Sequence, residues 1–195
     1  MNFKYYIANT DYDWFQYLKE LSPDDINFWQ PGGKLSFSAI PIGAPFILKL
    51  KSPINKIAGL GFYVSHSILP IEFSWEIFKE RNGVPSLEIL KDKVSNYRSP
   101  DNSLEKNPNI GCIILSNPLF FNEKDWLNIP SNWAGNIVQG KTYNTEDQFG
   151  KEFWQNIEAL LDKYEFFSLE KESKNQLVLE PNEANKYGKE VLTRV

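Results

Sequence analysis

The order of hydrophobic and polar residues predicts a chain that mixes strands with helices. Short apolar runs of strand length alternate with segments in which apolar residues recur every three or four positions, the spacing of an amphipathic helix. We expect strands at residues 3–8, 46–51, 57–64 and 110–115, and helices at 14–21, 75–81, 86–97 and 148–166. The strands on either side of the turn at 52–56 are expected to pair as a hairpin. The fully apolar run at 110–115 is expected to lie centrally in the sheet.

The stretch at residues 27–33 has an unusual composition, and the rest of the chain is interpreted around it. Phe28 and Trp29 lie between the carboxamides of Asn27 and Gln30, and a proline and two glycines follow directly. These residues predict a sharp turn that leaves the preceding side chains in a cleft. An aromatic face beside amide donors and acceptors suits a flat, hydrogen-bonding ligand such as a nucleobase. The alternative is that both aromatic residues are core packing.

Composition limits the classes of protein that need to be considered. The chain has 195 residues, a length typical of one domain, and 15% of them are aromatic. The formal net charge of −4 argues against a protein that holds nucleic acid by bulk electrostatics, although a local basic face is compatible with it. No apolar run is long enough to span a bilayer and no signal peptide precedes the first strand, so we expect a cytoplasmic protein.

The single cysteine and the single histidine argue against metal and nucleophilic sites. Cys112 lies in an apolar run, where a buried and inert thiol is expected. His66 is flanked by Ser65 and Ser67, but neighbours in a strand point to opposite faces, so His66 is not expected to activate either hydroxyl. We therefore expect no catalytic residues, no metal and no cofactor, and we assign His66 to solvent or to a phosphate contact.

Residues 135–142 match the phosphate-loop pattern letter for letter. The match begins at Gly135 and ends with Gly140, Lys141 and Thr142. A phosphate loop follows a buried strand and opens into a helix, whereas a proline-containing segment precedes this match and a poor helix start follows it. Residues 137–138 suit a strand better. A nucleotide-hydrolysing enzyme built on this segment is kept as an alternative function.

Basic residues gather between the 27–33 stretch and the first hairpin. They are Lys34, Lys49, Lys51 and Lys56, and the middle two are expected on one face of a strand. Such runs are usually solvated faces. Beside an aromatic cleft they could instead hold phosphates while the cleft holds a base.

Six motifs together resemble a known family. They read YYIANTD from Tyr5, NFWQPG from Asn27, PFILKL from Pro45, GLGF from Gly59, IGCI from Ile110 and NIVQGKTY from Asn136. The chain resembles the N-terminal, EVE-like domain of bacterial HNH endonucleases of the modification-dependent restriction type. EVE domains belong to the PUA-like group, which also contains the YTH and SRA readers. The HNH nuclease motif itself is missing from this chain, which is therefore either part of a longer protein or a stand-alone reader.

The resemblance implies an α+β, PUA-like or EVE-like fold, in which helices flank a curved mixed β-sheet or barrel. It also implies a pocket for a flipped, modified base of DNA, expected to be 5-methyl- or 5-hydroxymethylcytosine. Residues 1–167 would form the reader domain and residues 168–195 a polar linker toward an HNH nuclease domain. The expected base-binding residues are Trp29, Asn27, Gln30, Phe28, Trp14 and Gln139, and the expected phosphate-binding residues are Lys34, Lys49, Lys51, His66 and Lys141.

Three questions stay open from the sequence. An RNA reader is an alternative, because related folds bind modified RNA, and a purely structural interaction domain would place all the aromatic residues in the core. The chain could also form a homodimer. The modification that is read has no signature in these residues.

Overall fold

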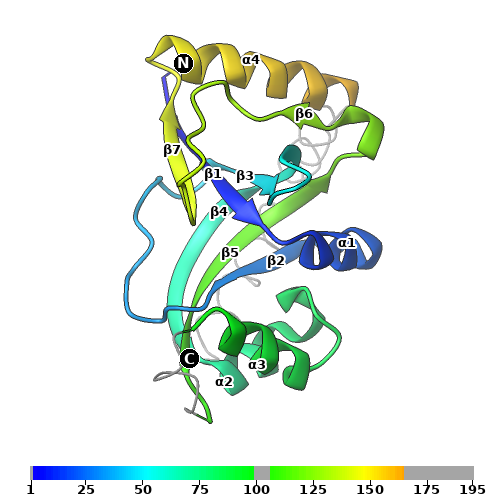
Figure 1. Ribbon diagram of the computed structural model, residues 1–195, viewed down its shortest axis with the longest axis vertical. Coiled ribbons are helices and arrows are strands. Elements are labelled where there is room, and N and C mark those ends of the chain that lie inside the picture. Colours follow the sequence, from blue (N-terminus) through cyan, green and yellow to red (C-terminus); the bar gives the residue numbers. More distant parts are fainter. Residues whose placement is uncertain (1, 99–105, 165–195) are drawn as a thin grey trace, which may run out of the picture. The chain divides into compact units, whose positions relative to one another are not determined.

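The computed structural model describes residues 2–98 and 106–164 of the chain. These residues form a mixed α+β fold around one seven-stranded sheet (Figure 1). The strands are β1 (Lys4–Thr10), β2 (Asp25–Gln30), β3 (Pro45–Leu50), β4 (Lys56–Pro70), β5 (Asn109–Phe120), β6 (Leu127–Asn128) and β7 (Gly140–Asn144). The helices are α1 (Tyr12–Leu21), α2 (Ile71–Phe78), α3 (Leu87–Asn96) and α4 (Gln148–Lys163). The expectation of an α+β chain is confirmed.

The sheet has the strand order β2-β5-β4-β3-β1-β7, with β6 paired to β4 at one side of this path. β1 and β3 are parallel, and every other pairing is antiparallel. Among the described residues β2 and β7 are the two ends of the strand order, so the sheet is open and not a closed barrel. The long crossover between the parallel strands carries α1 and β2, as a parallel pair requires.

The chain divides into two compact units, Met1–Lys151 and Glu152–Val195. The first unit contains the whole sheet and α1 to α3, and everything described below belongs to it. α4 begins in the first unit and continues into the second. The polar segment expected at 168–195 lies outside the described residues.

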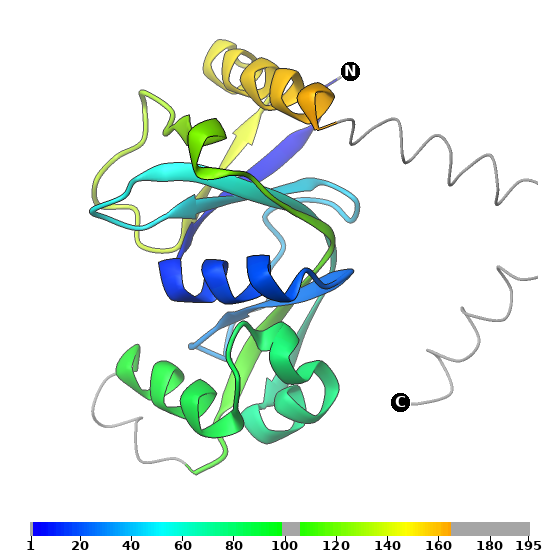
Figure 2. The same cartoon turned by 90° about the vertical axis from the view of Figure 1, so that its right-hand side faces the viewer.

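Curvature of the long strands brings helices and sheet into one core. The register between β4 and β5 shifts twice, between Leu60 and Phe62 and between Tyr63 and Ser65, and such irregularities bend a strand pair. The strands curve around α1 (Figure 2). Trp14, Phe15 and Leu18 form the buried side of α1, and the Phe15 ring lies 5.3 Å from that of Phe120. The apolar side of α1 therefore packs against the sheet, as its amphipathic pattern predicts.

Most elements that the sequence predicts are present, β2 was not predicted, and one expectation is wrong. The hairpin of β3 and β4, the N-cap of α3 by Ser86 and the apolar strand at 110–115 are confirmed. Residues 27–30, for which the sequence analysis predicts no strand, form β2 and pair with β5, so that Trp29 lies opposite Cys112. Residues 137–138, expected in a strand, precede β7, which begins at Gly140.

Candidate functional site

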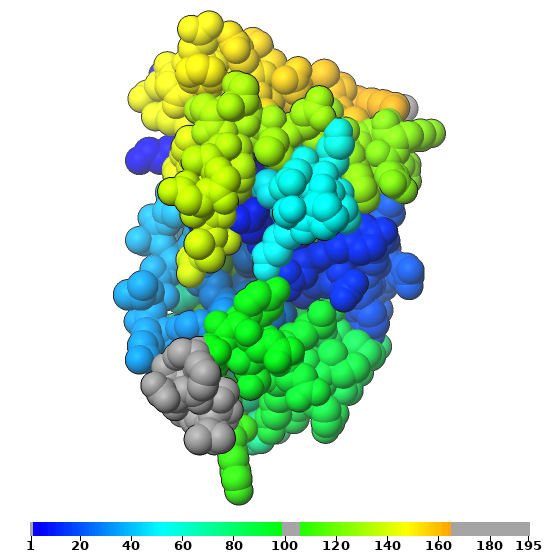
Figure 3. All heavy atoms as spheres, in the orientation of Figure 1, coloured from blue at the N-terminus to red at the C-terminus, as the bar shows by residue number. Residues whose placement is uncertain are grey.

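A cavity of about 240 Å³ lies in the first unit where six separate segments meet. β1, the start of α1, β2, the residue after β3, the residue after α3 and the segment before β7 all contribute to its wall. Figure 3 shows one face of the molecule, on which three of these segments are visible. They are the segment before β7, the turn after β3, and α3. The lining residues are Tyr6, Asn9, Thr10, Asp11, Trp14, Phe28, Trp29, Gln30, Pro31, Lys51, Tyr97, Val138 and Gln139.

Aromatic rings form much of the wall. Trp14, Phe28 and Trp29, all expected to bind a base, line the cavity together with Tyr6 and Tyr97. The rings of Trp14 and Phe28 pack edge to face with centroids 5.4 Å apart, and Trp29 lies 6.2 Å from Tyr97. Trp29 is mostly buried, at 9% exposure, yet it has a hollow beside it. The structure therefore combines the two interpretations of this residue, since the indole is part of the core and of a cavity wall.

A buried polar network fixes the orientation of the indole. Trp29 Nε1 donates to the main-chain oxygen of Asn82 at 3.0 Å. Asn27 is fully buried beneath it, and its Nδ2 donates to Asn82 Oδ1 at 2.9 Å and to Ser74 Oγ at 3.2 Å. Asn27 and Trp29 are two residues apart in β2 and therefore point to the same face of the sheet. Asn27 nevertheless does not line the cavity, because its amide is bonded within this buried network. The structure places Asn27 behind Trp29, where it supports the indole and does not face a ligand.

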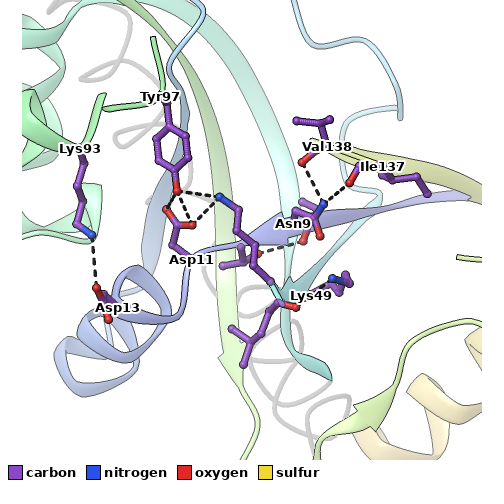
Figure 4. Close-up of polar contacts among 12 residues, drawn as sticks. Asn9, Asp11, Asp13, Lys49, Lys93, Tyr97, Ile137 and Val138 are labelled. Carbon is purple, nitrogen blue, oxygen red and sulfur yellow. Dashed lines mark hydrogen bonds and ion pairs between the residues drawn. The ribbon is translucent and has the colours of Figure 1, made fainter. Parts of the chain in front are cut away.

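An ion pair with a tyrosine partner closes one side of the cavity. Lys51 Nζ lies 2.6 Å from Asp11 Oδ1 and donates to the Tyr97 hydroxyl at 2.9 Å, while that hydroxyl lies 2.7 Å from the Asp11 carboxylate (Figure 4). The ammonium also lies 4.4 Å from the centre of the Tyr97 ring. Burial alone would lower the pKa of Lys51, but the hydrogen bonds to Asp11 and Tyr97 raise it above its ordinary value. Lys51 is thus charged and paired, so this wall carries no net charge.

Asn9 connects the centre of the sheet to the segment before β7. Its Nδ2 donates to Ile137 O at 2.7 Å and to Val138 O at 3.0 Å (Figure 4). Its main-chain N–H donates to Gln139 O at 2.8 Å. Three hydrogen bonds therefore hold residues 137–139 although they form no strand. Gln139, expected to read a base edge, lines the cavity because of this attachment.

Gln30 lines the cavity too, but its amide lies over a glycine of the neighbouring strand. A Cβ atom built at Gly111 would lie 3.1 Å from Gln30 Oε1 and 3.0 Å from His66 Nε2. The Gln30 amide and the His66 ring therefore use the space that the absent side chain leaves. His66 does not line the cavity.

The lysines expected at phosphates have different environments. Lys49 is buried at 3% exposure, and its ammonium donates to Leu50 O at 3.1 Å and to Asn55 Oδ1 at 2.9 Å. Burial and the charge of Lys51 lower its pKa. Lys34 is exposed, and Lys141 Nζ donates to Asn132 O at 3.3 Å. Lys51 is the one member of this group in the cavity lining.

The surroundings of His66 predict a pH effect on stability. Its Nε2 is buried, with no partner among the described residues, and burial lowers the pKa of the ring below 6.5. The unfolded chain therefore takes up a proton near pH 6.5 that the folded chain takes up only at lower pH. Stability from this group is complete above about pH 6.5 and is lost below it. We expect the free energy of unfolding of the wild type, relative to His66→Gln, to fall between about pH 7.5 and 5.5 in urea titrations. If the difference in the free energy of unfolding between wild type and His66→Gln did not change with pH, the prediction would be wrong.

The phosphate-loop match at 135–142 has the wrong structural context. Lys141 and Thr142 lie within β7, which pairs antiparallel with β1. A phosphate loop instead needs its lysine at the start of a helix, where main-chain N–H groups surround the phosphate. Among the described residues no group of three or more histidine, cysteine or carboxylate side chains could hold a metal ion. No described helix has the length and apolar character needed to cross a membrane.

Sequence analysis missed several polar residues of the wall, among them Asn9, Asp11 and Tyr97. Asp11 occupies the N-cap position of α1, but its side chain makes no cap hydrogen bond and contacts Lys51 and Tyr97 instead. A sequence signal existed only for Asn9 and Asp11, which lie within the first motif of the family resemblance. Tyr97 follows α3, 86 residues from Asp11, and nothing local connects the two.

Comparison with known proteins gives the fold but no close relative. No protein-family model and no curated protein sequence matches the chain. Similar solved structures include an ASCH protein from Zymomonas mobilis, at 9% identity and a TM-score of 0.54, covering 80% of this chain and 94% of that one. Two single-substitution variants of that protein match at 6% identity, with TM-scores of 0.53 and 0.55; they cover 77% and 78% of this chain and 95% of each variant. ASCH domains share the PUA-like fold with EVE domains, so the chain has a PUA-like fold, while the narrower EVE-like group of HNH endonucleases is a resemblance in sequence motifs alone.

Proposed function

We propose that this domain binds DNA and holds one everted, modified base in the cavity beside Trp29. The observation that carries the proposal is a hollow of about 240 Å³ whose wall combines aromatic rings with amide groups. Cavities for drug-sized ligands are commonly about 300–1,000 Å³, so this one suits a smaller group such as a single base. The ligand would be cytosine substituted at its 5-position.

The free energy that the aromatic wall can supply is similar to the free energy that base eversion costs. Taking a base out of a duplex costs a few kcal/mol of stacking and pairing. Stacking on an aromatic side chain is worth about 1–3 kcal/mol per base, and Trp29, Trp14 and Phe28 offer rings in the cavity lining. Gln139 and the Asp11–Lys51 pair add polar groups that could bond the base edge. Stacking and hydrogen bonds together are therefore on the scale that eversion requires.

The charge of the wall favours a neutral group over a phosphate. Lys51 is paired with Asp11, so we assign it to the base and not to the DNA backbone. A second hollow, of about 490 Å³, shares Asp11, Lys51 and Tyr97 with the cavity and includes Lys93. Lys93 lies 3.7 Å from Asp13 Oδ2 and is paired as well, so in the proposal this second hollow receives the adjoining sugar and not a phosphate. The domain would serve as the specificity part of an HNH restriction endonuclease.

Binding to matched DNA duplexes tests this function. Fluorescence anisotropy would compare one sequence containing cytosine, 5-methylcytosine or 5-hydroxymethylcytosine at a single site, and RNA of the same sequence would be added as competitor. We expect at least one modified duplex to bind about tenfold or more tightly than the unmodified duplex. Equal affinity for all three duplexes would reject the reader function. Tighter binding of the RNA would replace it by RNA reading.

A further inference from the structure

We infer that the cavity selects bases that carry an exocyclic amino group, and that Asn9 Oδ1 accepts a hydrogen bond from that group. The inference rests on the proposed function, because it assigns the edge of the base that this same cavity reads. It names a residue outside the expected base-binding set. It also concerns the 4-amino group of the base and not its 5-substituent.

The first argument is an unpaired acceptor in a residue that lines the cavity. Asn9 Oδ1 is buried and has no hydrogen-bond partner among the described residues. Buried acceptors without a partner are uncommon. Asn27 Oδ1 is another among the described residues, but Asn9 is the one of the two that lines the cavity. A ligand N–H group in the cavity would be a donor for Asn9 Oδ1.

The second argument is that the amide orientation is fixed. An asparagine oxygen and nitrogen are hard to distinguish by shape, so their assignment depends on the neighbours. Here the neighbours are the main-chain oxygens of Ile137 and Val138, which lie 2.7 Å and 3.0 Å from Nδ2. Two carbonyl oxygens require the NH₂ end of the amide, so Oδ1 is the end that remains for another partner.

The third argument is the arrangement of acceptors around Asn9. Asp11 also lines the cavity, and its carboxylate keeps acceptor capacity beyond the bonds from Lys51 and Tyr97. An exocyclic amino group has two N–H bonds and can serve two acceptors. Thymine and uracil instead present one ring N–H between two carbonyl oxygens, and these oxygens would face the acceptors of the wall. Lys51 supplies a donor for the ring nitrogen or carbonyl of an aminopyrimidine.

A chemical double-mutant cycle tests the assignment without relying on one variant. Duplexes with a single 5-methylcytosine would be compared with duplexes containing 5-methylpyrimidin-2-one, which lacks only the 4-amino group. We expect wild-type protein to bind the second duplex about tenfold more weakly, the loss that follows when a buried acceptor stays unpaired. Asn9→Ala should bind 5-methylcytosine more weakly and discriminate little between the two bases. Asn128→Ala is the matched control, because Asn128 lies on β6 and accepts from Lys56 away from the cavity lining.

The outcomes separate this inference from the proposed function. If wild-type protein prefers 5-methylcytosine to cytosine but binds both test duplexes equally, the reader function stands and the amino-group assignment is wrong. Wild-type protein that binds none of the modified duplexes would overturn both. Asn9→Ala could lose the attachment of residues 137–139 and fail to fold, which its thermal melting would reveal. In that case the comparison of the two bases on wild-type protein decides the question by itself.

Discussion

Replacing Trp29 with alanine will abolish the preference for a modified base and will also destabilise the domain. The indole is 91% buried, and its Nε1 is bonded to Asn82 O, so the substitution removes a large core side chain and a buried hydrogen bond. Truncations of this kind lower the free energy of unfolding by about 3–5 kcal/mol. The loss of binding has a separate cause, since the wall of the cavity loses an aromatic face. Urea denaturation and DNA anisotropy measure the two effects.

Two further variants separate the ligand effect from the stability effect. Trp126→Ala removes a half-buried indole that packs on Phe15 and lies outside the cavity lining, so it should lower stability while the base preference remains. Trp29→Phe keeps an aromatic face and should keep a reduced preference. A folded Trp29→Ala protein that still discriminates modified from unmodified DNA would show that the base does not stack on Trp29.

Replacing Gly83 with alanine will cause the second large effect. The Gly83 backbone has a φ of +74°, which L-residues avoid, and an added Cβ would lie 2.1 Å from Trp14 Cδ1. Strain and the forced movement of a core ring together should lower the free energy of unfolding by about 3 kcal/mol. Because Trp14 also lines the cavity, ligand affinity should fall as well. Denaturation midpoints and anisotropy test both expectations.

Gly32→Ala is the matched control for this substitution. No atom lies within 4 Å of the position of a Cβ at Gly32, and its backbone is not in the positive-φ region. The change in the free energy of unfolding should therefore stay below about 0.5 kcal/mol. If Gly83→Ala and Gly32→Ala changed the free energy of unfolding equally, the backbone at Gly83 would have room to relax and Trp14 would be free to move.

Sequence reasoning predicted most of the elements and singled out Trp14, Phe28 and Trp29, which line the cavity, and the reasons are local. Apolar spacing at 14–21 and the apolar run at 110–115 are properties of neighbouring residues, and α1 and β5 formed there. Trp29 was found because an aromatic pair between amides is unusual. The burial of Asn27 outside the cavity lining was not predicted, because it depends on the pairing of residues 25–30 with β5 and on contacts with distant residues.

Asp11 and Tyr97 in the polar wall escaped prediction because their positions depend on long-range contacts. Lys49 and Lys51 look equivalent in the sequence, yet Lys49 is buried against Asn55 while Lys51 lies at the cavity. Tyr97 meets Asp11 only because the end of α3 comes close to the end of β1. Burial and ion pairing of this kind arise only in the folded structure, so they cannot be predicted from a short segment of the sequence.

The position of β1 between β3 and β7 sets a limit on when the domain becomes competent during synthesis. Ile7 pairs with Ile47 on one side and with Lys141 on the other, so the edge of the cavity near Gln139 forms only after β7 has left the ribosome. A nascent or truncated chain that ends before β7 would expose the free edge of β1 and bind no base. Under the proposed function, base binding therefore requires that β7 has joined the sheet.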